Sequence, residues 1–358
     1  MSRLCFLVVM TSLIGCRCGE RRTAQFAKID AHAHVGPAAV PHLLRLMDRW
    51  GISTTVNLSG GWPGEGLEAS LLAARRAPGR IVVFATPPLR RASQGGDWAA
   101  KLPEELERAK ALGARGVKIF KALGLSVRGP AGALVPVDDP ALDALFEKAG
   151  ALGMPVAIHT GDPVAFWQPV REENERYDEL MAHPGWSYAG HPVPSWEALF
   201  EQYERLVARH PHTTFIGVHF GNAPEDPARV GAMLERFPTL YVDTAARIPE
   251  LGRRGVPELR ALFLKHQDRI LFGTDLGVGV DESDLMLGST GTTPPTPDDV
   301  TRFFTATWRF FETGDRRFPH PTPIQGRWTI DGLELPPEVL RKVYGGNAAR
   351  LLGLPNPL

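Results

Sequence analysis

Cysteine is almost absent from this sequence of 358 residues: all three cysteines, Cys5, Cys16 and Cys18, lie near the N-terminus. The rest of the chain therefore has no disulfide, no thiolate metal ligand and no cysteine nucleophile, so its chemistry depends on nitrogen and oxygen groups. An excess of either charge is also missing, because 40 basic residues balance 40 acidic ones and leave no basic field for nucleic acid. The sequence does have ample apolar material, 43% of its residues, which is enough for a large globular core.

The chain also lacks an apolar run long enough to cross a membrane. The run from Leu4 to Ile14 falls far short of the roughly 20 residues that a transmembrane helix needs, so it predicts a secretory signal. The segment LIGC, which ends at Cys16, resembles the lipobox of bacterial lipoproteins, in which the cysteine is lipidated; an ordinary cleaved signal peptide is the alternative. We expect residues 1–25 to be signal and linker. We also expect an exported protein of the bacterial cell envelope, which contacts the membrane only through a lipid on Cys16.

From residue 26 to residue 358, short β-rich segments alternate with longer amphipathic ones, which is typical of repeated βα units around a parallel sheet. The predicted strands cover residues 28–34, 54–58, 81–86, 116–120, 155–159, 214–219, 240–244 and 270–275. Eight such units in one domain predict an α/β fold of the (β/α)₈ TIM-barrel type. An open doubly wound sheet is the runner-up, and the absence of a GxGxxG turn after the first strand counts against it.

Two connections are too long to be simple turns, one of about fifty residues after the fifth strand and one of about twenty-five after the eighth. Both follow strand ends, so in a barrel they would lie over the C-terminal face, where catalytic sites are found. We expect long loops there that form a lid or a pocket wall, with plain surface connection as the alternative.

Ionisable residues end five of the predicted strands. They are His32, His34, Lys118, His159, His219 and Asp275. In the last four cases a small residue stands two positions earlier, and side chains two apart on a strand share a face, so all six are expected to point into one barrel mouth. One such residue alone would more often be a hydrogen-bonded core group, but six would be costly to bury without a cation. Imidazoles and a carboxylate without sulfur suit Zn²⁺ first, with Fe²⁺ or Mn²⁺ as alternatives.

Several motifs together resemble the amidohydrolase superfamily, in particular its amidohydrolase 2 branch. They are DAHAH, AIHTG, GVHFGN, LYVDTAAR, ILFGTD and the closing VYGGNAARLLGL, which span nearly all of the chain after the signal. The resemblance implies that His32, His34, His159 and Asp275 bind one divalent metal ion. It also implies that His219 is a further ligand or a catalytic residue that polarises the substrate.

Lys118 has two interpretations. In binuclear members of the superfamily a lysine on the fourth strand is carboxylated and bridges two metals, whereas in the amidohydrolase 2 branch a single metal is more usual. The alternative, which we favour, is a lysine that pairs with Asp275 or with a substrate anion.

The resemblance leads to a mechanism for hydrolysis of a lactone, ester or amide bond in a small molecule. The metal would lower the pKa of a bound water toward ~7, and Asp275 would accept its proton and pass it to the leaving group. The metal and His219 would stabilise the oxyanion. Further residues are candidates for contact with substrate, with plain surface roles as the alternative, and Asp243 is expected to orient neighbouring groups. The substrate candidates are Trp62, Lys121, Arg171, Tyr177, Tyr188 and Arg247.

Two other functions remain open at this point. Branch members with the same metal ligands remove CO₂ from unsaturated or aromatic acids, so a non-oxidative decarboxylase is the first alternative. A lipid-anchored binding protein that has lost activity is the second, and the intact set of histidines and Asp275 argues against it. The sequence does not predict the oligomeric state.

Overall fold

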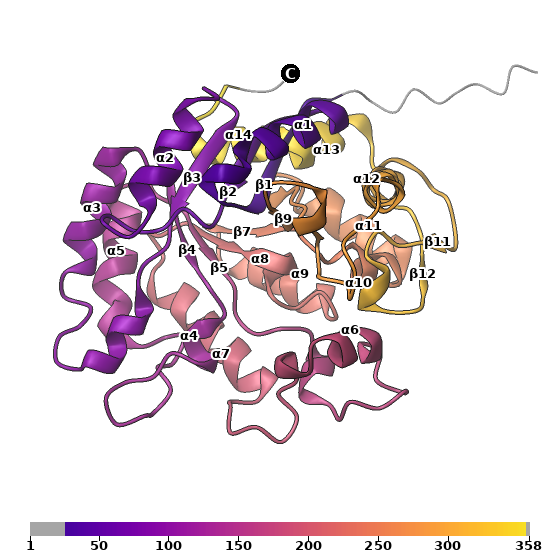
Figure 1. Cartoon of the computed structure of the whole chain (residues 1–358). Helices are drawn as coiled ribbons and strands as arrows, with labels where there is room; N and C mark the ends of the chain where they lie inside the picture. The colour runs from indigo at the N-terminus through magenta and orange to yellow at the C-terminus, as the bar shows by residue number, and fades with distance from the viewer. Residues whose placement is uncertain (1–25, 356–358) are drawn as a thin grey trace, which may run out of the picture.

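The computed structural model describes residues 26–355, and in that range eight parallel strands form a barrel (Figure 1). The strands are β1 (Lys28–Val35), β2 (Ile52–Asn57), β3 (Ile81–Ala85), β4 (Gly116–Ile119), β5 (Val156–Ile158), β6 (Phe215–Gly217), β7 (Leu240–Asp243) and β8 (Ile270–Leu271). Each pairs in parallel with the next strand along the chain. The predicted TIM-barrel fold is therefore confirmed, and every predicted strand overlaps an observed one.

The barrel closes where the chain after β8 meets β1. The Ala31 amide donates to the Phe272 carbonyl at 2.9 Å, and the Asp275 amide donates to the His32 carbonyl at 2.8 Å. A short strand, β9 (Leu276–Val278), then continues beside β1 in parallel, and β10 (Leu285–Leu287) folds back on it as an antiparallel strand. The sequence did not predict this hairpin. It means that the connection after the eighth strand is not a plain long loop.

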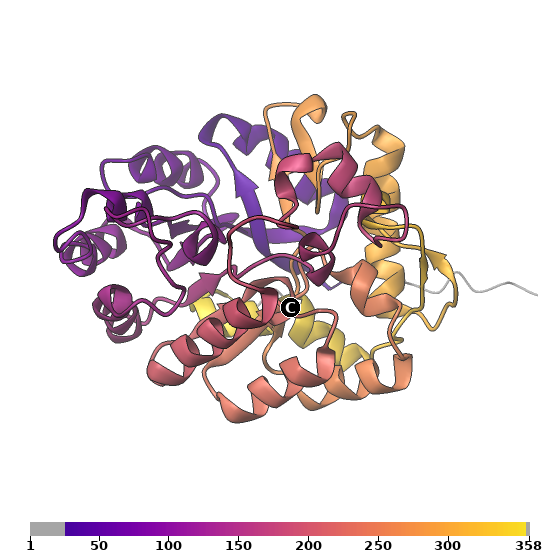
Figure 2. The same ribbon diagram turned by 90° about the horizontal axis from the view of Figure 1, so that it is seen from below.

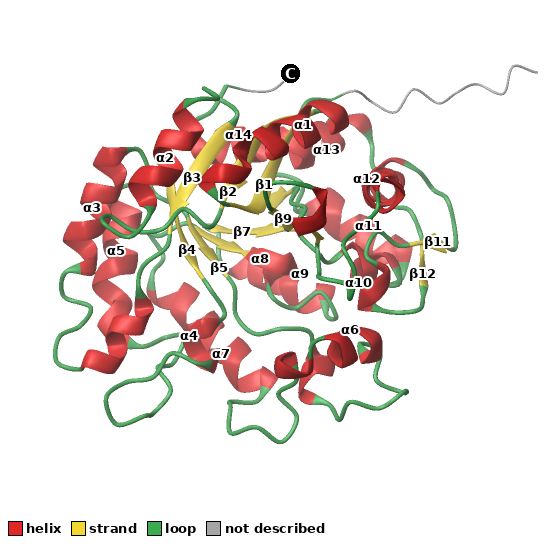
Figure 3. Ribbon diagram, in the orientation of Figure 1, coloured by secondary structure: helices red, strands yellow, loops and turns green. Residues whose placement is uncertain are grey.

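Helices surround the strands, as the red and yellow elements of Figure 3 show. The outer helices are α1 (Val40–Trp50), α2 (Leu67–Arg75), α3 (Leu102–Leu112), α5 (Asp143–Ala151), α7 (Trp196–Arg209), α9 (Pro227–Arg236), α11 (Val256–Lys265), α12 (Pro297–Glu312), α13 (Pro337–Arg341) and α14 (Asn347–Leu352). Their apolar faces are buried: α7 packs Leu199, Tyr203 and Leu206 inward, and the Ser195 side chain caps its N-terminus by accepting from the Ala198 amide. Short helices α4 (Ala122–Leu125), α6 (Tyr177–Ala182), α8 (Val218–Gly221) and α10 (Ile248–Gly252) follow strand ends.

The connection between β5 and β6 lies below the barrel in Figure 1 and in front of it in Figure 2. It is not one long loop, because it contains α6 and α7. A buried ion-pair cluster fixes α6: Arg176 binds Glu179 at 2.8 Å, and its other terminal nitrogen meets Glu250 in α10. This part of the connection is therefore held against the barrel by its charged groups.

Among the described residues, no helix is both long and apolar enough to span a bilayer. The predicted signal segment and the Cys16 lipid site lie outside the described residues.

Candidate metal centre and active site

Three groups converge where β1 ends beside the segment after β8. Nε2 of His32 lies 3.2 Å from Oδ1 of Asp275, and Nε2 of His34 lies 3.3 Å from the same oxygen. His32 is completely buried, whereas His34 and Asp275 retain some exposure, so the cluster is at the floor of the barrel mouth. The structure thus brings together two predicted ligand histidines and the predicted carboxylate.

Each histidine is oriented by a hydrogen bond at its other ring nitrogen. Nδ1 of His32 lies 2.8 Å from Oδ2 of Asp243, and Nδ1 of His34 lies 2.7 Å from the Ser59 hydroxyl. Nδ1 of His219 donates to the Ala245 carbonyl at 2.9 Å. The bonds to the Asp243 carboxylate and the Ala245 carbonyl require a proton on Nδ1, so in the neutral rings of His32 and His219 Nε2 is unprotonated and able to bind a cation. Asp243 orients its neighbours as expected.

Asp243 supports the centre at a second point. Its Oδ1 accepts from the His219 amide at 2.8 Å and from the Ala245 amide at 3.1 Å. One buried carboxylate on β7 therefore fixes the ring of His32 and the backbone of His219 at the same time.

His219 reaches the mouth through an unusual backbone turn, not through the strand period. Gly217 lies on the outer face of β6, because a Cβ there would meet the Tyr203 hydroxyl of α7 at 2.4 Å. The prediction that Gly217 and His219 share the inward face is therefore wrong. His219, Phe220 and Asn222 have left-handed φ values of 53°, 56° and 63°, and this turn redirects the imidazole.

The residues fit a divalent cation. Ligand atoms of His32, His34 and Asp275 all lie within 4.8 Å of one another, as do those of His32, His219 and Asp243. Tetrahedral ligands with bonds of ~2.1 Å stand about 3.4 Å apart, close to the observed separations of 3.2 and 3.3 Å. Nε2 of His32 and Nε2 of His159 are buried without a hydrogen-bond partner, which is the state expected of atoms that bind an ion.

His159 stands at the edge of this arrangement. Its ring lies 4.3 Å from the ring of His219, centroid to centroid, but it belongs to neither of the two three-residue groups. Its Nε2 lies 3.9 Å from Oδ1 of Asp162. The structure therefore places His159 beside the cluster, one ring farther out than the other predicted ligands.

The electrostatic environment sets distinct charge states. Burial opposes the charge of Asp275, yet the charge of His32 and the close approach of the His32 and His34 rings hold the pKa of its carboxyl well below the usual range. Burial lowers the pKa of His159 and of His219 well below the usual value, and the positive charge of Arg247 adds to the effect. Burial opposes the charge of His32, but the carboxylates of Asp243 and Asp275 raise its pKa above the usual value. At neutral pH the site therefore contains the ionised Asp275 carboxylate beside neutral His159 and His219, which are the forms of these groups that bind a metal.

One comparison identifies the family. The sequence model of the amidohydrolase family matches residues 29–354, which is most of the chain. The chain belongs to the amidohydrolase family. This is a superfamily of metal-dependent enzymes. No protein with a curated function matches the sequence significantly.

Solved structures that match the chain share the barrel of the amidohydrolase family. A TIM-barrel protein of Bordetella bronchiseptica is 16% identical with a TM-score of 0.50, and the match covers 91% of this chain and 98% of that one. A 2,6-dihydroxybenzoate decarboxylase complexed with 2,6-dihydroxybenzoate is 18% identical (TM-score 0.50; 92% and 100% covered). An amidohydrolase of Burkholderia multivorans with bound zinc is 15% identical (TM-score 0.50; 92% and 99% covered). At these identities the likeness establishes the fold alone.

Lys118 lies inside this amidohydrolase site. Its Nζ is buried with neither a hydrogen bond nor, among the described residues, a carboxylate oxygen within 4.0 Å. The expected direct pair with Asp275 is therefore not formed. Burial lowers the pKa of Lys118 to about 8, although Asp243 and Asp275 oppose the shift. Its Nζ lies 5.3 Å from the centre of the Phe120 ring, which in turn packs against His34.

Three of the six predicted substrate residues are buried or engaged near the centre. Arg247 is buried and its charge acts on His159 and His219. Lys121 is instead engaged by Asp162, with Nζ–O distances of 2.6 and 2.8 Å, and the Tyr188 hydroxyl donates to the same carboxylate at 2.7 Å.

The other three substrate candidates do not reach the cluster. Trp62 is in the hydrophobic core with 1% exposure, and its indole N–H donates to Glu105, so the expected substrate contact is wrong. The reason is that its ring belongs to the buried cluster that includes the apolar residues of α2 and α3, and not to the barrel mouth. Arg171 is exposed, and Tyr177 is half-buried at the start of α6; neither has a described contact with the histidines.

Four supporting residues escaped the sequence analysis. Asp30 accepts from the Thr274 hydroxyl at 2.6 Å and from the amides of Thr274 and His32, which locks β1 to the segment after β8. Ser59, Asp162 and Asn222 orient His34, Lys121 and the Thr160 amide. Asp30 was visible as the first letter of DAHAH, and Asp162 as the acid after AIHTG, but only the fold shows what each one touches.

Proposed function

We propose that the protein is a hydrolase that cleaves a lactone, ester or amide bond of a small molecule with a metal-activated water. The observation that carries the proposal is the ionised Asp275 carboxylate, placed 3.2 and 3.3 Å from Nε2 of His32 and His34 at the barrel mouth. A carboxylate beside a metal centre is well placed to accept a proton from water.

The proposed metal ligands are His32, His34, His159 and Asp275, with His219 as a further ligand. A bound divalent ion would supply a water of lowered pKa and polarise the substrate carbonyl. Zn²⁺ is our first choice, because the donors are imidazoles and carboxylate and because the Burkholderia multivorans neighbour is described with bound zinc. Fe²⁺ and Mn²⁺ are alternatives, and a carboxylated Lys118 would make the site binuclear.

The proton is proposed to move through Asp275, which accepts it from the attacking water and returns it to the leaving group. Of the two roles expected for His219, we favour that of a further ligand. Because its Nδ1 donates to Ala245, the neutral ring has no proton on Nε2, which favours a ligand role over hydrogen bonding to an oxyanion. Lys118 and Arg247 are the cations proposed to stabilise negative charge on the substrate.

A metal-dependent decarboxylase is the second candidate. It is favoured by the unpartnered ammonium of Lys118 and the buried guanidinium of Arg247, which suit a carboxylate substrate. A 2,6-dihydroxybenzoate decarboxylase is also among the structural neighbours. A binding protein without activity would be expected to have lost metal ligands, and none of the five is missing here.

The deciding experiment uses the full-length chain loaded with Zn²⁺. Lactones, esters, amides and aromatic acids are offered in water enriched in ¹⁸O, and both ¹⁸O in the product acid and released CO₂ are measured. Label in the product without CO₂ supports the hydrolase, whereas CO₂ without label supports the decarboxylase. Turnover should be lost in Asp275→Asn and kept in the control Asp97→Asn, whose exposed carboxylate belongs to neither group of candidate metal ligands. A chain that binds no divalent ion refutes both enzymes.

Export and anchoring at Cys16 also stand as a proposal. It rests on the short N-terminal apolar run and the LIGC segment. Radiolabelled palmitate should enter the protein in a bacterial host and should not enter a Cys16→Ser variant. Incorporation of palmitate into the Cys16→Ser variant would show that the lipid is attached to another residue and would contradict the proposal.

A further inference from the structure

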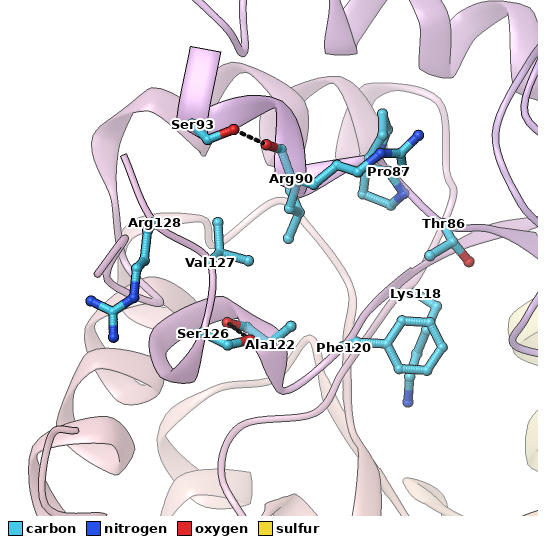
Figure 4. Close-up of a pocket in the computed structure, with 12 residues that line it drawn as sticks. Thr86, Pro87, Arg90, Ser93, Lys118, Phe120, Ala122, Ser126, Val127 and Arg128 are labelled. Atoms are coloured by element: carbon cyan, nitrogen blue, oxygen red, sulfur yellow. Dashed lines mark hydrogen bonds between the residues drawn. The ribbon is translucent and has the colours of Figure 1, made fainter. Parts of the chain in front are cut away.

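A cavity of about 430 Å³ adjoins the metal centre on the side of β3 and β4 (Figure 4). Its walls come from the segments that follow these two strands, at the face of a TIM barrel where substrates bind. Lys118 and Phe120 form its inner end, and these are the residues that contact the site: Phe120 packs on the ring of His34 at 5.6 Å. The cavity volume is in the range that holds one small organic ligand.

Phe120 forms the boundary between cavity and centre. It is half-buried and belongs to none of the hydrophobic clusters formed by the described residues, so it is not needed to build the core. One contact is His34, and another is the ammonium of Lys118, 5.3 Å from the ring centre. An aromatic ring so placed offers a surface for the part of a substrate next to the reacting bond.

The charged residues that line the cavity are all of one sign. Three of its lining residues are basic and none is acidic, although the whole chain has equal numbers of both. Lys118 is at the inner end and Arg128 at the outer end, with Val127 between them, whereas the Arg90 side chain extends toward Pro87 and away from Arg128 (Figure 4). Leu89 adds to the apolar lining. This distribution excludes a cationic ligand and suits one with an apolar body and an anionic end.

The charge at the outer end suits a carboxylate better than a phosphate. Arg90 already donates to Glu65, whereas Arg128 uses one nitrogen on the neutral Gly132 carbonyl. Arg128 therefore supplies a single unpaired positive charge, which matches a singly charged group. Its guanidinium keeps free N–H donors for a carboxylate.

We propose that this cavity is the specificity pocket, and that the substrate carries a carboxylate at the end remote from the reacting bond. The apolar middle of the substrate lies along Phe120, and its remote carboxylate meets Arg128. This inference rests on the proposed function, because the reacting bond is assigned to the centre beyond Phe120. In ester form, water adds to the acyl carbon, the acyl C–O bond breaks, and the alcohol leaves with the proton returned by Asp275.

The test measures binding apart from turnover. Linear diacids from succinate to suberate, and the monoacids of the same chain lengths, are titrated calorimetrically into the zinc-loaded full-length chain. We expect at least one diacid to bind about tenfold more tightly than its matched monoacid, as a second charge-assisted contact predicts. The advantage should disappear in the Arg90→Gln/Arg128→Gln double variant and persist in Arg76→Gln, an exposed arginine outside the cavity.

Equal affinity for every diacid and its monoacid, or a preference that the double variant retains, would overturn the pocket. Glu65 also binds Arg91, so removing Arg90 leaves this carboxylate paired, and the double variant is expected to fold. The monomethyl esters of the same diacids give the activity arm. Preference for diacids without ester hydrolysis would support the specificity pocket and refute the hydrolase. Ester hydrolysis without preference for diacids would support the hydrolase and refute the specificity pocket.

Discussion

Replacing Asp243 by asparagine should weaken metal binding without removing any metal ligand. In the native protein the carboxylate accepts from Nδ1 of His32 at 2.8 Å and from the His219 amide at 2.8 Å. Asparagine has the same shape and keeps one oxygen for the backbone amide. It then turns its NH₂ group toward His32, which forces Nδ1 to accept and moves the ring proton to Nε2.

A proton on Nε2 must be lost before that atom can bind a cation. Losing one hydrogen bond to a charged group costs about 1.5–3 kcal/mol, and changes to such supporting groups typically lower metal affinity by roughly 10- to 100-fold. We expect zinc affinity to fall by this factor, measured by competition with a chelating dye. Asp97→Asn serves as the matched control, because it makes the same chemical change on the surface.

A stability measurement separates tautomer change from misfolding. Asp243→Asn should unfold in the presence of chelator at nearly the native urea concentration, while the extra stability that zinc gives to the native chain is reduced. Unchanged zinc affinity in a folded Asp243→Asn would refute the reasoning, because it would show that the proton position on His32 does not matter.

Three further predictions concern stability without metal, each followed by urea unfolding. Lys118→Met should abolish a rise in stability between pH 8 and 10.5, because the folded pKa of about 8 lies below the unfolded value and the unfolded state binds the extra proton in that window. Asp30→Asn should remove a fall in stability as the pH rises from about 4 to 6, because burial raises the pKa of Asp30 to about 6. Gly217→Ala should destabilise by about 1–3 kcal/mol, because the added methyl would meet the Tyr203 hydroxyl at 2.4 Å. The first prediction is contradicted if Lys118→Met keeps the native pH dependence of stability. The second is contradicted if Asp30→Asn still loses stability as the pH rises above 4. The third is contradicted if Gly217→Ala is as stable as the native protein.

The barrel was predictable because its signals are local. Alternating βα segments locate the strands, and the period of two places His32 and His34 on one face with no knowledge of the rest of the chain. The antiparallel strand β10 was not predicted, because Leu285–Leu287 is a three-residue segment in a connection rich in glycine and proline. Only its pairing with β9 makes it a strand.

Contacts across the barrel were beyond the reach of the sequence. Asp243 lies 211 positions from His32, and nothing in the sequence between them shows that the two side chains meet. For Trp62 the sequence predicted a contact that does not exist. Its position in a glycine-rich turn suggested a substrate-binding residue, but the folded protein buries the ring in the core. In both cases the deciding fact is which helix or strand covers the residue.

The backbone turn at His219 explains why the two-residue period of a strand does not predict the direction of this side chain. It also explains why the strained backbone conformation is retained. With Gly217 facing α7, a residue two positions farther along an extended strand would also face the helix layer, away from the metal centre. The left-handed conformations of His219 and Phe220 cost roughly 1–2 kcal/mol each, and they reverse the direction of the imidazole. Asp243 offsets part of that cost by accepting from the His219 amide, and the buried Phe220 ring packs against Phe263. The same carboxylate that orients His32 thus holds the strained turn in place, so the site and the strain depend on one residue.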